Sequence, residues 1–140
     1  MNDFSLDKAT ILLIDPQQEI LRLLVDTLSA AGYHCCAAED GEQACQIAQQ
    51  RAPDLIIADV HLEGENGPDV CRRVIDQAHL GDAPTMFLSR SQSPDVIRRT
   101  YEGGGAFHLR KPFDPSVLLE LVDRALWMPT LVSSQSDTAY

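Results

Sequence analysis

The chain has 140 residues, the size of one ordinary domain, and its 44% hydrophobic and 23% charged residues are typical of a globular protein. Its net charge of −10 argues against direct nucleic-acid binding, which depends on basic side chains that neutralise phosphates. No apolar run approaches the roughly 20 residues that span a bilayer, and the N-terminal segment MNDFSLDKAT lacks the pattern of a secretory signal. We therefore expect a cytoplasmic protein that binds neither nucleic acid nor a membrane.

In chain order, short apolar runs alternate five times with segments of helical periodicity. The first three runs predict strands at 10–15, 33–38 and 54–59, followed in turn by helices at 17–32, 40–52 and 67–78. The last two predict strands at 84–89 and 106–109, followed in turn by helices at 93–104 and 114–127. We expect one domain over residues 1–127, and the Ser-rich segment 128–140, which begins with Met-Pro, to be a tail or a linker to an absent output domain.

Residues with known capping preferences mark the ends of these helices. Gly32 follows the first helix, where a left-handed backbone commonly ends a helix. Asp40, Ser93 and Asp114 are placed as N-caps, and Pro68 falls in a first helical turn. The caps agree with the periodicity and support the same division of the chain.

The strands indicate the arrangement of the sheet. Three of the five are near-continuous apolar runs, which is typical of parallel strands covered on both faces. Right-handed crossovers between such strands give an α/β fold, a doubly wound five-stranded parallel sheet with helices on both faces. Sites in this architecture form at the carboxyl ends of the strands.

The four cysteines have no CxxC spacing and lie mostly within apolar stretches. They are interpreted as reduced, buried, small hydrophobic residues. His34, Cys35 and Cys36 are consecutive, but neighbours on a strand point to opposite faces, so core packing is favoured over a metal site.

Four chemically active residues end four of the predicted strands: Asp15, Asp59, Ser89 and Lys111. Because parallel strands share one carboxyl edge, we expect these side chains to converge. Two carboxylates can hold a hard cation such as Mg²⁺. Beside a cation and a lysine, a carboxylate can attack phosphorus, since the charge of the transferred group is neutralised. The pattern therefore predicts an aspartate that accepts a phosphoryl group.

The segments ILLID, PDLIIADVHLEGENG, PTMFLS and LRKPF stand in this order, at spacings that match a known family. Over residues 9–127 the chain resembles the receiver domain of bacterial two-component response regulators, which has a flavodoxin-like fold. The resemblance implies a signalling domain rather than an enzyme, with a sensor histidine kinase or a phosphotransfer protein as the phosphoryl donor.

The same resemblance assigns roles to five residues. Asp59 would be the phosphoacceptor, Asp15 an Mg²⁺ ligand, and His61 would offer its backbone carbonyl to the metal. Ser89 would be the switch hydroxyl, and Lys111 would contact the phosphoryl group. In this family Lys111-Pro112 would have a cis bond, which the proline makes accessible.

Several positions depart from the family pattern. Pro16 stands where the family has a second acid, so one oxygen ligand is missing and Mg²⁺ affinity is expected to fall. Glu63 and Glu65 are candidates for compensation, or solvated loop acids. Arg90 follows the switch serine in place of a small residue, and could obstruct the pocket or contact an anion.

The surface that changes partners in this family is built by the fourth helix, the fifth strand and the fifth helix. Arg98, Arg99, Tyr101 and Arg110 are expected on or near it, and a homodimer through this surface is a hypothesis. His108 takes the place of the switch aromatic, which makes it a pH-sensitive switch candidate or a half-buried strand histidine.

Parts of the sequence suggest three other functions. The principal one is a pseudo-receiver, a protein-interaction module that works without phosphorylation; Pro16 and Arg90 favour it, and the intact Asp15, Asp59, Ser89 and Lys111 oppose it. Asp59, His61 and Gly64 match the DxHxxG pattern of cobalamin-binding domains, but they follow the third strand rather than the first. A flavodoxin-like cofactor protein lacks support because DPQQE, rather than a Gly-rich or Ser/Thr-rich phosphate loop, follows the first strand.

Overall fold

In the computed structural model, residues 8–90, 93–102 and 107–138 are described, with only the backbone of 128–138. A five-stranded parallel sheet forms the centre of the chain, with strand order β2-β1-β3-β6-β7. Its strands are β1 (Thr10–Ile14), β2 (His34–Ala38), β3 (Leu55–Asp59), β6 (Thr85–Ser89) and β7 (Phe107–Arg110). The predicted doubly wound α/β fold is confirmed.

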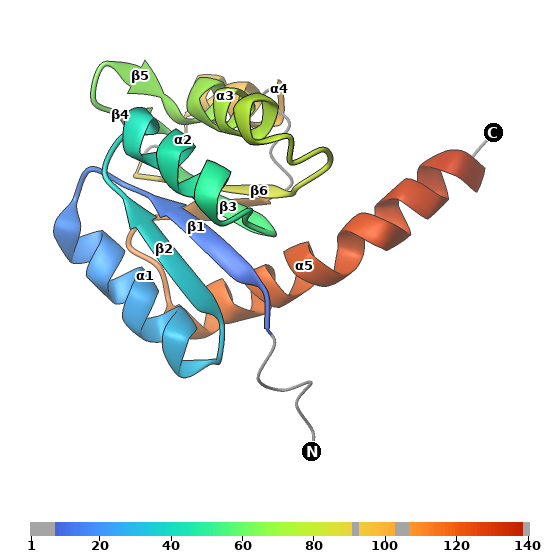
Figure 1. Cartoon of the computed structure of the whole chain (residues 1–140), viewed down its shortest axis with the longest axis horizontal. Helices are drawn as coiled ribbons and strands as arrows, with labels where there is room; N and C mark the ends of the chain where they lie inside the picture. The colour runs from blue at the N-terminus through green and yellow to red at the C-terminus, as the bar shows by residue number, and fades with distance from the viewer. Residues whose placement is uncertain (1–7, 91–92, 103–106, 139–140) are drawn as a thin grey trace.

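Helices cover both faces of the sheet (Figure 1). They are α1 (Gln18–Ala30), α2 (Gly41–Gln50), α3 (Gly67–Ala78), α4 (Pro94–Glu102) and α5 (Pro115–Thr138). Helices α1 and α5 lie on one face, and α2, α3 and α4 pack on the other.

The continuous apolar runs follow from this two-sided cover. Along β3, Ile56 and Ala58 join one hydrophobic core, while Leu55 and Ile57 join the core on the opposite face. Because successive side chains alternate between faces, a strand buried on both sides needs an apolar residue at every position.

The predicted caps at Gly32 and Asp40 are formed. Gly32 has φ +98°, and its N–H donates to the Ser29 carbonyl, while the N–H of Tyr33 donates to the Leu28 carbonyl. Asp40 accepts a 2.9 Å hydrogen bond from the Gln43 backbone N–H at the start of α2. Sequence chemistry therefore sets these helix ends.

Two segments differ from the sequence expectation. A short hairpin, β4 (His61–Leu62) and β5 (Glu65–Asn66), follows β3 where only a loop was expected; Gly64, with φ +74°, lies in its turn. The last helix was expected to end at residue 127, but α5 continues to Thr138 and extends away from the sheet (Figure 1). Pro129 removes a backbone donor without ending the helix, since a proline can interrupt the hydrogen-bond pattern locally.

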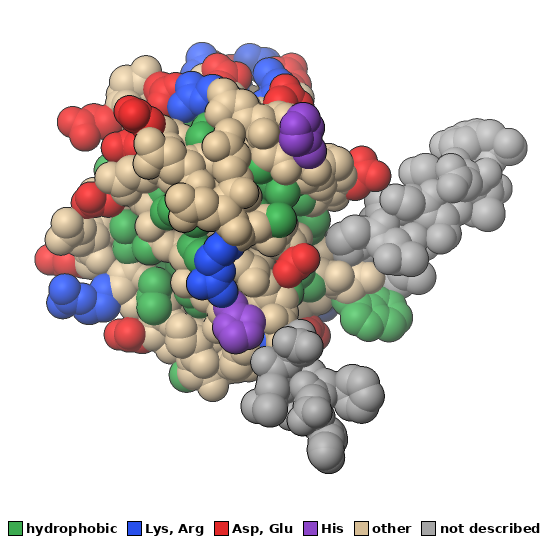
Figure 2. Space-filling model, viewed as in Figure 1, with side chains coloured by type: hydrophobic (Ala, Val, Ile, Leu, Met, Phe, Trp, Pro, Cys, Tyr) green, Lys and Arg blue, Asp and Glu red, His purple; other side chains and the backbone are tan. Residues whose placement is uncertain are grey.

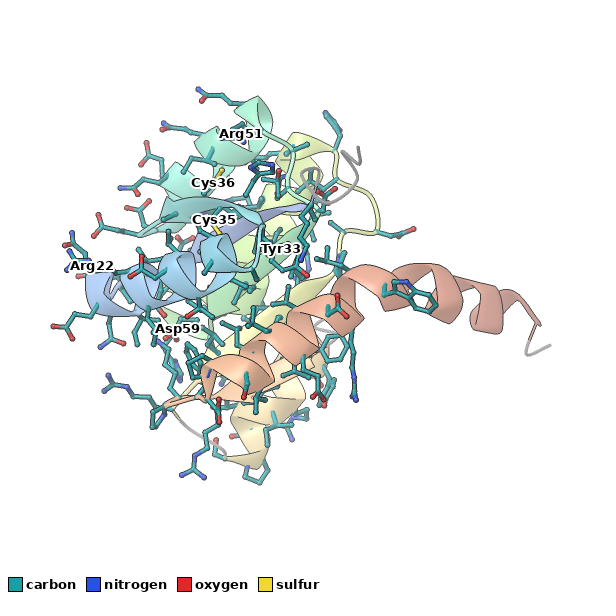
Figure 3. The ribbon with its side chains drawn as sticks, turned by 90° about the horizontal axis from the view of Figure 1, so that it is seen from below. Arg22, Tyr33, Cys35, Cys36, Arg51 and Asp59 are labelled. Carbon is teal, nitrogen blue, oxygen red and sulfur yellow. The ribbon has the colours of Figure 1, made fainter. Side chains whose placement is uncertain are left out.

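The four cysteines are free thiols, as expected, but only Cys45 and Cys71 are buried, whereas Cys35 and Cys36 on β2 are partly exposed. Cys35 and Cys36 lie on opposite sides of β2 (Figure 3) and pack against different cores. On the face in Figure 2, hydrophobic side chains form small separate areas among polar ones. Among the described residues, no helix is long and apolar enough to cross a membrane. Gly103–Gly105 and Ala106, the first residue of a predicted strand, lie outside the described residues.

Candidate functional site

The carboxyl edge of the sheet brings together the residues predicted there. Asp59 ends β3 and Ser89 ends β6, Asp15 follows β1, and Lys111 follows β7. All four are buried, with exposed fractions of 0% for Asp15 and Ser89, 4% for Lys111 and 8% for Asp59. In Figure 3, Asp59 lies beneath the N-terminal half of α1, while Tyr33, which precedes β2, lies toward the opposite end of the strands.

Lys111 joins the two carboxylates. Its Nζ donates to Oδ2 of Asp15 at 2.6 Å and to Oδ2 of Asp59 at 2.5 Å. A buried ammonium needs paired charges, and the two aspartates supply them. The two ion pairs leave a site with more acidic than basic groups, which favours an additional cation.

The remaining carboxylate oxygens accept backbone hydrogen bonds. Oδ1 of Asp15 accepts from the Gln17 N–H at 2.9 Å, and Oδ1 of Asp59 accepts from the His61 N–H at 2.6 Å. Each aspartate thus bonds the N–H two residues later, a local turn that fixes the orientation of its carboxylate.

Gln17 is a site residue that the sequence reading missed. Its Oε1 accepts from Lys111 Nζ at 3.3 Å, in addition to its backbone bond with Asp15. The available signal was its place two residues after a strand-ending aspartate, where such turns form.

Burial sets the electrostatics of Asp15. Loss of solvent raises the pKa of its carboxyl above 3.8, and hydrogen bonds from Lys111 and the Gln17 backbone oppose that rise. The carboxylate therefore depends on Lys111 for much of its stabilisation as an anion.

The Lys111-Pro112 bond is cis, as the resemblance implied. The backbone N–H of Lys111 donates to the Ser89 carbonyl at 2.9 Å. The ends of β6 and β7 are therefore joined beside the site.

Gly67 is a second residue that the sequence reading did not assign. Its N–H donates to the Val60 carbonyl at 2.7 Å, and a Cβ at this position would overlap the backbone oxygen of Asp59. Only glycine allows α3 to begin this close to the phosphoacceptor candidate.

Other predicted residues lie outside this group. Glu65 pairs with Arg73 at 2.6 Å, and within the described part of the chain no cluster of three or more His, Cys, Asp or Glu side chains could hold a metal. Glu63 and Glu65 are both exposed, and compensation by either for the acid missing at Pro16 stays a prediction. Arg90 is exposed directly after β6.

The predicted switch and partner residues lie on α4 and β7. Arg98, Arg99 and Tyr101 are exposed on α4, and Arg98 pairs with Asp95 at 2.6 Å. His108 is half-buried on β7; its Nε2 is buried without a hydrogen-bond partner among the described residues, and burial lowers its pKa below 6.5.

The site offers oxygen donors that suit Mg²⁺. The carboxylates of Asp15 and Asp59 and the backbone carbonyl of His61 are oxygen donors of the kind that this ion prefers. Mg²⁺ is usually held by one or two protein carboxylates together with waters and phosphate oxygens. The residues therefore fit the ion, with one ligand fewer than a second acid at position 16 would give.

The fold and site define a doubly wound α/β domain with an acidic, lysine-bridged centre at its carboxyl edge. Residues 11–123 match the response regulator receiver domain family, and the chain belongs to this family. Receiver domains are signalling modules that interact with histidine kinases or phosphotransfer proteins, and they generally bind Mg²⁺ at the phosphorylation site.

Two curated relatives show the extent of the similarity. The phosphate regulon transcriptional regulatory protein PhoB of Pseudomonas aeruginosa is 33% identical over 110 residues, which cover 79% of this chain and 48% of that protein. Protein Rrf1 of Nitratidesulfovibrio vulgaris is 31% identical over 118 residues, which cover 84% of this chain and 83% of that protein. The chain thus spans about half the length of PhoB and most of Rrf1.

Solved structures agree with this membership. The Vibrio cholerae chemotaxis protein CheY4 superposes with a TM-score of 0.81 at 31% identity, covering 86% of this chain and all of that one. NtrX from Brucella abortus superposes with a TM-score of 0.82 at 26% identity, covering 94% of this chain and 30% of that one. The receiver fold therefore extends over most of the chain.

Proposed function

We propose that this receiver domain accepts a phosphoryl group on Asp59 from a histidine kinase or phosphotransfer protein in the bacterial cytoplasm. The observation that carries the proposal is the contact of Lys111 Nζ with both Asp59 and Asp15. This contact places a fixed positive charge beside the carboxylate that would receive the group. Residues 1–127 would form the receiver, and 128–140 would be a tail or lead to an output domain.

Each of these residues would have a part in the transfer. Asp59 is the more exposed of the two site aspartates, and the His61 N–H holds its Oδ1. An Asp59 oxygen would form the new bond to phosphorus as the bond to the donor's leaving group breaks. Lys111 would then donate to a phosphoryl oxygen, which neutralises part of the transferred charge. Ser89 would supply the switch hydroxyl.

The metal site would use Asp15, Asp59 and the His61 carbonyl. When bound, Mg²⁺ would offset the negative charge of the phosphoryl oxygens. Because Pro16 contributes no side-chain oxygen, we propose weak Mg²⁺ binding, with transfer needing a high concentration of the ion.

The output surface would comprise α4, β7 and α5. His108 would act as the switch residue, and Arg98, Arg99 and Tyr101 would face a partner or the second copy of a homodimer. Tyr101 is 60% exposed, which leaves an aromatic side chain available for such a contact.

The second candidate is a pseudo-receiver, a phosphorylation-independent interaction module. Pro16 favours it because a ligand is lost, and the exposed Arg90 favours it because a bulky cation follows Ser89. The Lys111 contacts with Asp15 and Asp59 favour the receiver instead.

Intact mass spectrometry after incubation with acetyl phosphate separates the two candidates. We expect a Mg²⁺-dependent gain of one phosphoryl group in the wild type and none in Asp59→Ala. A folded wild-type protein that gains no mass even at high Mg²⁺ would overturn the receiver proposal and favour the interaction module.

A further inference from the structure

Arg73 lies between three elements near the β4–β5 hairpin, which follows Asp59. It belongs to α3, its guanidinium contacts Glu65 of β5 through two hydrogen bonds, at 2.6 and 3.3 Å, and it lies against Gly41 at the start of α2. We call Arg73, Glu65 and Gly41 the Arg73 clamp. Basic and acidic side chains gather in this region, over β5 and α3 (Figure 2).

Gly41, the first residue of α2, makes the arrangement possible. It is buried, and a Cβ there would overlap Nη2 of Arg73 and lie 3.0 Å from Oε2 of Glu65. The guanidinium and the carboxylate therefore occupy the space that any other side chain would fill. The carboxylate also lies at the N-terminus of α2, where the helix dipole favours negative charge.

The hairpin connects the clamp to Asp59. Glu65 pairs with Leu62 and Asn66 pairs with His61, so the two short strands form one unit. Leu62 is buried in the core on one strand of this unit, and the clamp holds the other strand. The His61 N–H at its base donates the 2.6 Å hydrogen bond to Asp59 Oδ1.

We propose that Arg73 and Glu65 are positioning residues: with Gly41, they fix the β4–β5 hairpin so that the His61 amide orients the Asp59 carboxylate for phosphoryl transfer. The claim that the clamp affects phosphoryl transfer rests on the proposed function. The claim that it orients the Asp59 carboxylate does not, because that orientation can be measured in the unphosphorylated protein.

Gly41→Ala is the sharpest variant. The overlapping atom is the end of a flexible side chain, so the new Cβ can be accommodated by moving Arg73, while Arg73 and Glu65 both stay in the chain. Glu65→Gln and Arg73→Gln test the same contact by removing charge. Arg72→Gln is the matched control, since Arg72 neighbours Arg73 on α3 and, within the described part of the chain, makes a single ion pair, the exposed one with Asp69.

The primary measurement is the amide proton shift of His61 by NMR. A short hydrogen bond to a carboxylate moves an amide proton downfield, so we expect an upfield change in all three clamp variants. The Gln17 amide, which bonds Asp15 on the other side of the site, is the internal control and should stay in place. In a double-variant cycle, the protein that carries both Glu65→Gln and Arg73→Gln should show the same change in the His61 amide shift as either single variant.

The second measurement is the rate of mass gain with acetyl phosphate. The clamp pair is half-exposed, so we expect each variant to slow transfer about two- to fivefold and Arg72→Gln to leave it unchanged. Unchanged His61 shifts in folded Gly41→Ala and Glu65→Gln proteins would overturn the inference, as would an equal shift in Arg72→Gln. A wild-type protein that gains no mass would overturn the proposed function alone. The His61 amide shifts would still show whether Arg73 and Glu65 orient the Asp59 carboxylate.

Discussion

Lys111 donates a 2.6 Å hydrogen bond to Oδ2 of Asp15, although 96 residues separate them in sequence. The parallel arrangement of β1 and β7 brings both residues to one edge of the sheet. Both side chains are almost fully buried, so each stabilises the other's charge in a place where water cannot.

Loss of Lys111 should therefore be costly. We expect Lys111→Met to lower the free energy of unfolding by about 3–5 kcal/mol at neutral pH, because two neighbouring carboxylates lose their counter-charge. Urea unfolding measures this change. Asp59→Asn is the control: it leaves the contact between Lys111 and Asp15 and should cost much less.

The cost of Lys111→Met should fall in acid. The pKa of Asp15 is already raised above 3.8 by burial, so the folded state takes up a proton at a higher pH than the unfolded chain does. As the pH falls toward the raised pKa of Asp15, protonation of this carboxylate relieves its repulsion with Asp59. An equal loss of stability at neutral and acidic pH would contradict this explanation.

Pro16→Asp should restore a metal ligand. Adding a carboxylate beside Asp15 supplies the oxygen that proline lacks, and we expect Mg²⁺ affinity to increase about tenfold or more. Isothermal titration calorimetry gives the affinity, and Glu19→Gln, at an exposed position of α1, controls for a general change in charge. A Pro16→Asp protein with wild-type affinity would show that position 16 does not reach the metal site.

The sequence predicted the elements that follow simple repeating rules. Apolar runs covered on both faces identified the strands, and because parallel strands share an edge, the convergence of Asp15, Asp59, Ser89 and Lys111 could be predicted. Gln17 could have been found from its place two residues after Asp15, where such turns form. The pairing of Glu65 with Arg73 could not be predicted, because a side chain's partner depends on turns whose geometry no periodicity reveals. The continuation of α5 past Pro129 was missed because proline was treated as a fixed stop.

Gly67→Ala should damage both fold and site. A Cβ at Gly67 would overlap the backbone oxygen of Asp59, and that strand end cannot move without disturbing β3. We expect a loss of about 1–3 kcal/mol, as for overpacking in a core, with slower phosphorylation. Gly64→Ala is the comparison, because nothing lies near its Cβ and only the backbone strain of φ +74° acts. Equal phosphorylation rates in the two variants would contradict a steric role beside Asp59.

His108 should make stability depend on pH. Burial lowers its pKa below 6.5, so the unfolded chain binds a proton at a higher pH than the folded protein does. Its contribution to stability is therefore complete above pH 6.5 and is lost as the pH falls through the lower, folded pKa.

His108→Phe keeps a ring of similar shape without the titrating group. Between about pH 7.5 and 5.5, urea unfolding should show a larger loss of stability in the wild type than in His108→Phe. His79→Gln, which alters an exposed histidine after α3, should behave as the wild type. If His108→Phe and the wild type lose the same stability over this range, the buried ring does not titrate on unfolding.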